Sequence, residues 1–278
     1  MNAPRVQFLL AALIGLVCSF QVAATPEADI ERVLLLSGLT KQVNEFPGLI
    51  EAGVMQGAQQ GADIPERELS LITESVSKTI LPAVIMADVR QAVASAVSES
   101  ELQSLLTWYQ SETGRAITTA EENASTAEAY QQIMANGRQL LSDRKRVDFA
   151  MRLDKLLGAT DLTMQMQEVS GVAVYAAMMS AMAPGQALNL DGYRAQIAAA
   201  QAQMRPNIEQ MMAASFVYTY QPIDDTSLAK YEAFLNTPAA KKFNAAAMAG
   251  LLKGIEKAVG SWATELGTIV KNSNAKEI

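Results

Sequence analysis

The sequence predicts an all-α protein made of two tandem, divergent helical repeats of about four to five helices each. No stretch alternates apolar and polar residues for long enough to form a strand, and alanine, a strong helix former, is abundant. The stretch 98–115 returns in divergent form 126 residues later, as 224–241. The sequence therefore predicts a helical unit followed by a second, divergent copy of that unit.

The repeated stretch has the spacing of an amphipathic helix. Four apolar residues of the first copy fall at i, i+3, i+4 and i+7: Leu102, Leu105, Leu106 and Tyr109. The second copy keeps this face, but Glu232 stands where Leu106 stood. We expect the second helix to be less covered at Glu232, at a groove or at the edge of a contact between the halves.

The first 24 residues have the pattern of a secretory signal peptide. Arg5 is followed by an apolar run over 6–17 and by the small residues before Thr25, which predicts cleavage after Ala24. A transmembrane anchor is the alternative, but the run is shorter than the roughly 20 residues that span a bilayer. Cys18 raises a lipoprotein alternative, for which the preceding Gly-Leu-Val is a poor match.

The composition excludes several kinds of chemistry. The chain has no histidine, and its single cysteine, Cys18, lies in the predicted signal. Disulfides, cysteine nucleophiles, Ser-His-Asp triads and zinc sites built from His or Cys are therefore excluded. The net charge of −7, one unit more negative without Arg5, argues against binding to nucleic acid or to an anionic membrane surface. We expect no cofactor and no metal.

Helix signals divide the first half. We expect helices over three segments before the repeated stretch: 25–37, 40–60 and 63–97. Pro26 fits a first helical turn, and Gly38 fits a helix end. Pro47 should bend or break the second helix, and Pro82 the third, because proline lacks the amide donor.

The repeated helix and the segment after it complete the first half. Ser98 and Glu101 form a capping box, and Ser111 should begin a further helix, interrupted near 136–137, where Asn and Gly disfavour helix interiors. The charged run 142–146 is the expected boundary between the repeats. We therefore expect a signal peptide over 1–24, a first repeat domain over 25–141 and a second over 142–278.

The second half repeats these signals. We expect helices over 164–182, 190–204, 225–235 and 238–271, with a loop at 183–185. Pro206 lies 124 residues after Pro82, and Asp224 stands where Ser98 stood.

The repeat unit resembles a known bacterial family. An acidic or hydroxyl-rich cap at 97–102 leads into an apolar helix, followed at 108–115 by an aromatic pair, Ser-x-x-Gly and a basic residue. This pattern is similar to the proteobacterial exported family called domain of unknown function 2059. Glu112 replaces the family's proline, whereas the second copy has Pro238 but Ala240 in place of the glycine. The resemblance implies compact helical domains exported to the periplasm, and it carries no catalytic residue.

The motif residues also form the candidate ligand site. Three aromatic residues and two bases could line a groove for a peptide or a glycan: Trp108, Tyr109 and Phe234 with Arg115 and Lys241. In the alternative interpretation the rings anchor the core and the bases are solvated. The expected partner is an envelope protein, peptide or glycan, with no nucleic acid and no integral membrane segment after signal cleavage.

Two alternatives to a non-catalytic binding module stay open. An envelope hydrolase could use carboxylates or the pair Ser75 and Lys78, although the adjacent Glu121 and Glu122 point to different sides of a helix. A copper-binding protein could use thioethers, which are soft ligands but which also fill helical cores. The methionines in question are Met164, Met166, Met178, Met179, Met182, Met211 and Met212.

Overall fold

The computed structural model describes residues 26–59, 66–182 and 188–274, and within these ranges the chain is α-helical with no strand. This confirms the predicted all-α class. The helices of residues 26–141 are α1 (Pro26–Leu36), α2 (Leu39–Gln59), α3 (Glu66–Thr79), α4 (Pro82–Ala96), α5 (Glu99–Gln110), α6 (Glu112–Ala124) and α7 (Ala127–Leu140). Those that follow are α8 (Arg144–Leu157), α9 (Ala159–Met182), α10 (Leu190–Thr219), α11 (Asp225–Leu235) and α12 (Pro238–Asn274). The predicted signal peptide and the 183–185 loop lie outside the described residues.

Local capping chemistry sets most helix ends. Gly38 and Gly158 have φ of 76° and 64°, in the left-handed region where glycine ends a helix at little cost, and they terminate α1 and α8. Glu101 accepts hydrogen bonds from the Ser98 amide and hydroxyl, at 2.9 and 2.8 Å, as a capping glutamate should. Asp224 caps α11 through the amides of the first turn.

The segment after α6 corrects one expectation. The helix ends at Ala124, and a new one begins after Thr126, whose hydroxyl accepts from the Ala129 amide at 3.1 Å. Asn136 lies inside α7, where its side chain donates to the Gln132 carbonyl at 2.9 Å instead of breaking the helix. The described part of the first half therefore holds seven helices rather than four or five.

The second correction concerns proline. Pro82 opens α4 as expected, but Pro206 lies inside α10, which continues to Thr219 instead of ending at 204. An interior proline costs about 3 kcal/mol. Beyond it, α10 buries Ile208 and Val217, and each buried side chain of this kind contributes about 1.5–3 kcal/mol, so tertiary burial offsets the cost. Pro47 likewise lies within a continuous α2.

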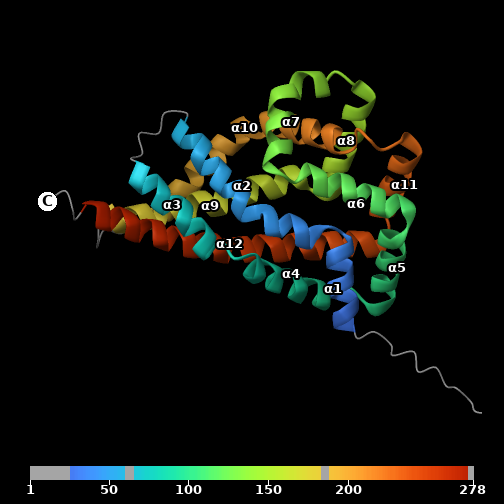
Figure 1. Cartoon of the computed structure of the whole chain (residues 1–278), viewed down its shortest axis with the longest axis horizontal. Coiled ribbons are helices and arrows are strands. Elements are labelled where there is room, and N and C mark those ends of the chain that lie inside the picture. Colours follow the sequence, from blue (N-terminus) through green and yellow to red (C-terminus); the bar gives the residue numbers. More distant parts are fainter. Residues whose placement is uncertain (1–25, 60–65, 183–187, 275–278) are drawn as a thin grey trace, which may run out of the picture.

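The long helix α12 is the axis around which both halves pack. It runs beside α4, α3 and α9 along the length of the molecule (Figure 1). Gly250 and Gly254 allow α12 to approach α4 closely, because an added Cβ would stand 2.5 Å from the Val89 Cα and 2.6 Å from the Ile85 Cα. The buried carboxylate of Asp88 then binds two lysines of α12 at 3.0 and 2.7 Å.

One hydrophobic core contains side chains from both halves of the chain. Fully buried members from the first half are Val33, Leu34, Ile85, Val89 and Leu105, and buried members from the second are Tyr220, Phe243, Ile255 and Val259. A smaller cluster joins α7, α8 and α10. The two halves are thus in direct contact.

The segment 66–96, which contains α3 and α4, is long and apolar enough by length and composition alone to cross a membrane. Core helices of water-soluble proteins meet the same criterion. Here α4 places Ile85 and Val89 against α12, and both are fully buried.

Candidate functional site

The predicted aromatic residues meet between α5 and α11. The Trp108 ring stacks on the Phe234 ring at a centroid distance of 4.4 Å and an interplanar angle of 6°, and Tyr109 meets Phe234 edge-on at 5.6 Å. Tyr109 and Phe234 are buried, and within the described structure the Trp108 Nε1 is buried without a hydrogen-bond partner. The rings are packed as in the alternative interpretation, in which they anchor the core.

The two predicted bases lie on the surface. Arg115 donates from Nε to the Gln110 carbonyl at 2.9 Å, so its charge lies against the carboxyl end of α5. That contact offsets the unfavourable position of a cation in the first turn of α6. Lys241 is exposed in the first turn of α12. The structure brings the three rings together, and it does not bring the bases onto them.

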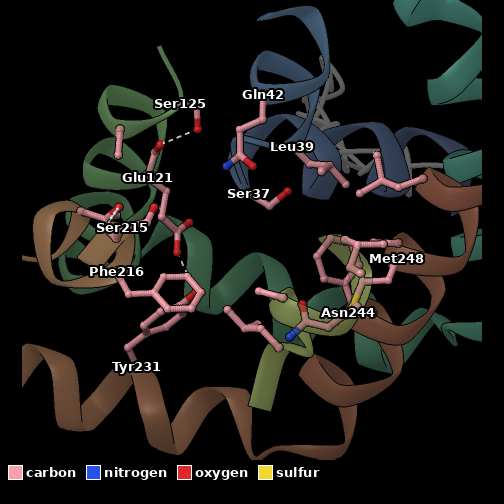
Figure 2. Close-up of a pocket in the computed structure, with 18 of the residues that line it drawn as sticks. Ser37, Leu39, Gln42, Glu121, Ser125, Ser215, Phe216, Tyr231, Asn244 and Met248 are labelled. Atoms are coloured by element: carbon pink, nitrogen blue, oxygen red, sulfur yellow. Dashed lines mark hydrogen bonds between the residues drawn. The ribbon is translucent and has the colours of Figure 1, made fainter. Parts of the chain in front are cut away.

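A separate cavity of about 330 Å³ lies among α5, α6, α10, α11, α12 and the junctions at Gly38 and Gly158 (Figure 2). One part of its wall is polar and comes from the first half: Ser37, Gln42, Glu121 and Ser125. The facing part comes from the second half and carries the aliphatic side chains of Leu157, Leu162, Met248 and Leu251, and the second half also contributes the polar side chains of Ser215, Thr219 and Asn244. The cavity therefore lies between the two halves and has two chemically different sides.

Glu121 is the ionisable group of this cavity. Its Oε1 accepts hydrogen bonds from the hydroxyls of Tyr220 at 2.6 Å and Tyr231 at 2.7 Å. Burial raises the pKa of Glu121, against the smaller opposing effect of the two tyrosine hydrogen bonds, and the charge of Glu122 raises it further. The carboxylate is thus held at a fixed point of the wall, in surroundings that penalise its charge.

Tyrosines surround this carboxylate. Burial, and then the charge of Glu121, raise the pKa of Tyr109, Tyr220 and Tyr231, so all three hydroxyls stay protonated. Phe216 and Phe243 add further aromatic surface to the lining. The described lining residues include no lysine and no arginine.

Sequence reasoning did not select Glu121, Tyr220 or Tyr231. It did predict that Glu121 and Glu122 diverge, and they do, since Glu122 pairs with Lys41 at 2.9 Å away from Glu121. The available signal was that Glu121 lies one turn after the buried Ile117, on the apolar face of α6.

The Ser75 and Lys78 side chains have separate partners. The Ser75 hydroxyl is buried, donates to the Ile72 carbonyl at 2.6 Å and accepts from the Trp262 indole at 2.9 Å. Lys78 forms an exposed ion pair with Glu74 at 2.8 Å. The hydroxyl is therefore engaged in packing α3 on α12.

The methionines of the copper alternative lie on α9 and α10. The six whose exposure is described are half-buried: Met164, Met166, Met178, Met179, Met211 and Met212. Met166 packs against the main core. This is the arrangement of methionines that fill a helical interior.

Glu232 lies at the contact between α8 and α11. Arg152 binds it with two hydrogen bonds of 2.7 and 3.1 Å, and the side chain of Glu232 is 27% exposed. A shallow hollow of about 270 Å³ adjoins the pair. The charge that replaces Leu106 is thus partnered across the contact.

Comparison with known proteins gives one match. Residues 84–143 match the family described as an uncharacterized protein conserved in bacteria, DUF2059. No curated protein and no solved structure matches the chain. The matched segment contains α5 and α6, and so Trp108, Tyr109 and Glu121, whereas Phe234 lies outside it. The chain therefore carries one DUF2059 domain, over residues 84–143.

Proposed function

We propose that this protein is a non-catalytic binding module and that the cavity around Glu121 is its ligand site. The observation that carries the proposal is the carboxylate that Tyr220 and Tyr231 fix on the wall of a cavity of about 330 Å³. Ligand pockets typically measure about 300–1,000 Å³, with mostly apolar linings and a few placed polar groups. The cavity is thus large enough for a small molecule, or for one side chain or sugar unit of a larger partner.

The lining favours binding over hydrolysis. Among the described lining residues Glu121 is the single carboxylate, whereas the two-carboxylate mechanism of glycoside hydrolysis needs a facing pair. The hydroxyls of Tyr220 and Tyr231 donate to Glu121 and hold its carboxylate in a fixed position, where it can contact a bound ligand.

Export is part of the same proposal. The signal-like residues 1–24 support secretion to the periplasm, where an envelope protein, peptide or glycan would be the partner. Mass spectrometry of the protein from a periplasmic fraction should give a mature chain that begins at Thr25, and a full-length chain retained in the cytoplasm would contradict this.

We also propose that the halves are tandem copies of one unit. Gly38 and Gly158, 120 residues apart, end α1 and α8 in the same conformation. Ser111 and Thr237, 126 residues apart, cap the next helix alike: their hydroxyls accept from the amide three residues on, at 3.0 and 3.3 Å. Elements at matched positions also meet reciprocally, with α5 on α12 and α11 on α6.

Matched positions line the cavity in pairs. At offsets of 120 or 126 residues the pairs are Ser37 with Leu157, Leu39 with Ala159, Gln42 with Leu162, Glu121 with Ala247, and Ser125 with Leu251. In four of these five pairs the first half supplies a polar group and the second an apolar one, and in the pair of Leu39 and Ala159 both are apolar. Divergence between copies at one shared cavity accounts for its two-sided chemistry.

A cavity-filling variant tests the binding proposal. The neutral fluorescent amine N-phenyl-1-naphthylamine serves as the probe, titrated against wild type, Ala124→Phe and Ala116→Phe. Ala124 lines the cavity, whereas Ala116 is exposed on the same helix and is the matched control. We expect Ala124→Phe to weaken probe binding by about tenfold or more and Ala116→Phe to leave it unchanged.

Circular dichroism establishes that each variant is folded. Equal binding by all three proteins would place the probe outside the cavity and contradict this prediction. If Ala124→Phe unfolds, Ser125→Leu is the alternative variant, because its larger side chain fills part of the same cavity from a half-buried position. Its effect on probe binding then tests the proposal.

A further inference from the structure

Among the residues that the structure describes, none that interacts with Glu121 is positively charged. The groups that face it are Tyr109 from α5, Tyr220 from α10 and Tyr231 from α11, with Glu122 next to it on α6. None of these is a cation, and Lys41 is already paired with Glu122. Burial of a carboxylate without a counter-ion favours its neutralisation by a proton or by a cationic ligand.

The aromatic rings around Glu121 form a wall suited to a cation. Tyr220 and Tyr231 lie with ring centroids 5.8 Å apart and planes at 49°, and Phe216 lies 6.2 Å from Tyr220 at 30°. All three rings belong to residues that line the cavity. The negative face of an aromatic ring attracts ammonium groups, most strongly where water is excluded.

The opposite wall is suited to an apolar body. Leu157, Leu162, Met248 and Leu251 offer aliphatic surface across the cavity from Glu121, and Figure 2 shows Met248 on the far side from the carboxylate. An anionic ligand would meet a carboxylate with no lysine or arginine among the described lining residues to offset it. A neutral ligand would leave Glu121 to be neutralised by a proton.

We infer that the cavity binds a small amphipathic organic cation, an amine or quaternary ammonium, with its charged head against Glu121 and the tyrosine rings and its apolar body against the leucines and Met248. The inference rests on the proposed function, because it names the ligand class of the same cavity. In the complex, the positive charge of the ligand compensates the charge of Glu121, a role that a proton takes in the free protein. Cation binding is therefore coupled to proton release from Glu121.

Three soluble probes of similar size test the charge preference by calorimetry at pH 7.5. They are benzyltrimethylammonium, neutral 3-phenyl-1-propanol and anionic 3-phenylpropanoate. We expect wild type to bind the cation at least about tenfold more tightly than the alcohol and to bind the anion weakest. Glu121→Gln keeps an oxygen that accepts hydrogen bonds from both tyrosines. We expect this variant to bind the cation about tenfold more weakly than wild type and to bind the alcohol with an affinity within about twofold of wild type.

The pH dependence of wild type supplies a readout that needs no variant. Because the pKa of Glu121 is raised, cation affinity should increase as the pH rises from 5 to 8, whereas the affinity for the alcohol should stay constant. This measurement decides the question if Glu121→Gln fails to fold.

The outcomes separate the two proposals. Equal affinity for cation and alcohol, or undiminished cation binding by Glu121→Gln, overturns the organic-cation inference. If N-phenyl-1-naphthylamine binding is still lost in Ala124→Phe in that case, the cavity remains the ligand site. If Ala124→Phe binds both N-phenyl-1-naphthylamine and the cation as wild type does, the proposed function fails as well.

Discussion

At the residue scale, Glu121 makes the stability of the fold depend on pH. A carboxyl group whose pKa is raised on folding stabilises the folded state at low pH, and this contribution is lost as the pH rises through the folded-state pKa. Glu121→Gln removes the titration but keeps an acceptor for Tyr220 and Tyr231. We expect the variant to equal wild type in unfolding free energy near pH 4 and to exceed it at pH 8.

Urea unfolding at the two pH values measures this difference, which amounts to about 1.4 kcal/mol for each unit by which the pKa is raised. Glu122→Gln is the matched control from the neighbouring position. It removes a surface ion pair with Lys41, which is worth about 0–1 kcal/mol. A wild-type advantage at pH 8 would contradict the assigned environment of Glu121.

Individual residues also show why the site was harder to predict than its surroundings. The capping roles of Ser98, Ser111 and Asp224 can be predicted from the local sequence, because a capping residue forms hydrogen bonds with residues two or three positions away. The partners of Glu121 are 99 and 110 residues away in the sequence. No spacing rule brings such residues together, so the hydrogen bonds follow only from the packing of α6 against α10 and α11.

At the element scale, the close approach of α12 to α4 depends on glycine. Gly254→Ala would set a Cβ 2.6 Å from the Ile85 Cα, so the helices must separate, and overpacking of this kind costs about 1–3 kcal/mol. Gly260→Ala on the same helix meets nothing within 4 Å and should instead stabilise by about 0.5–1 kcal/mol. Thermal unfolding of the two variants should shift in opposite directions.

A matched pair of this kind separates packing from helix propensity. If both alanine variants were stabilised, propensity alone would explain the result, and the contact between α12 and α4 would be looser than described. Destabilisation confined to Gly254→Ala locates the effect at the interface.

Elements also show where sequence signals give way to packing. The breaks at Pro82 and at Gly38 were predictable because each changes the backbone directly. Pro206 gives the same signal as Pro82, yet α10 continues through it, because Ile208 and Val217 are buried one to three turns later. The helix at Asn136 continues for a similar reason, with Ile133 and Leu140 buried on either side.

At the scale of the whole molecule, the shared core predicts one cooperative unfolding transition. Core residues of both halves form a single cluster, and α12 packs on α3 and α4 of the first half. Trp108 lies in the first half and packs on Phe234 of the second, and Trp262 lies in the second half and donates to Ser75 of the first, so both probes report on the contact between the halves. Trp108→Phe and Trp262→Phe each leave one fluorescent probe. Their urea midpoints should coincide with the midpoint from circular dichroism measured on the same variant.

Two separated transitions would show instead that residues 25–141 and 142–278 unfold as independent domains. The charged run 142–146 predicts a boundary between the halves, which stays a prediction; α8 begins at Arg144, with Asp143 as its cap. The sequence does not predict whether the two halves unfold together. Helix periodicity indicates which face of a helix is buried, but it does not indicate which other helix packs against that face.

If the halves are copies of one unit, as we propose, the pairing of polar and apolar positions around the cavity has an evolutionary consequence. A homodimer of a single ancestral unit would present the same side chain from both subunits, so a carboxylate on one wall would face its own symmetry mate. Fusion of two copies into one chain releases that constraint. Ala247 could then replace a second carboxylate without altering Glu121, and a symmetric interface could become a directional receptor with a head end and a tail end.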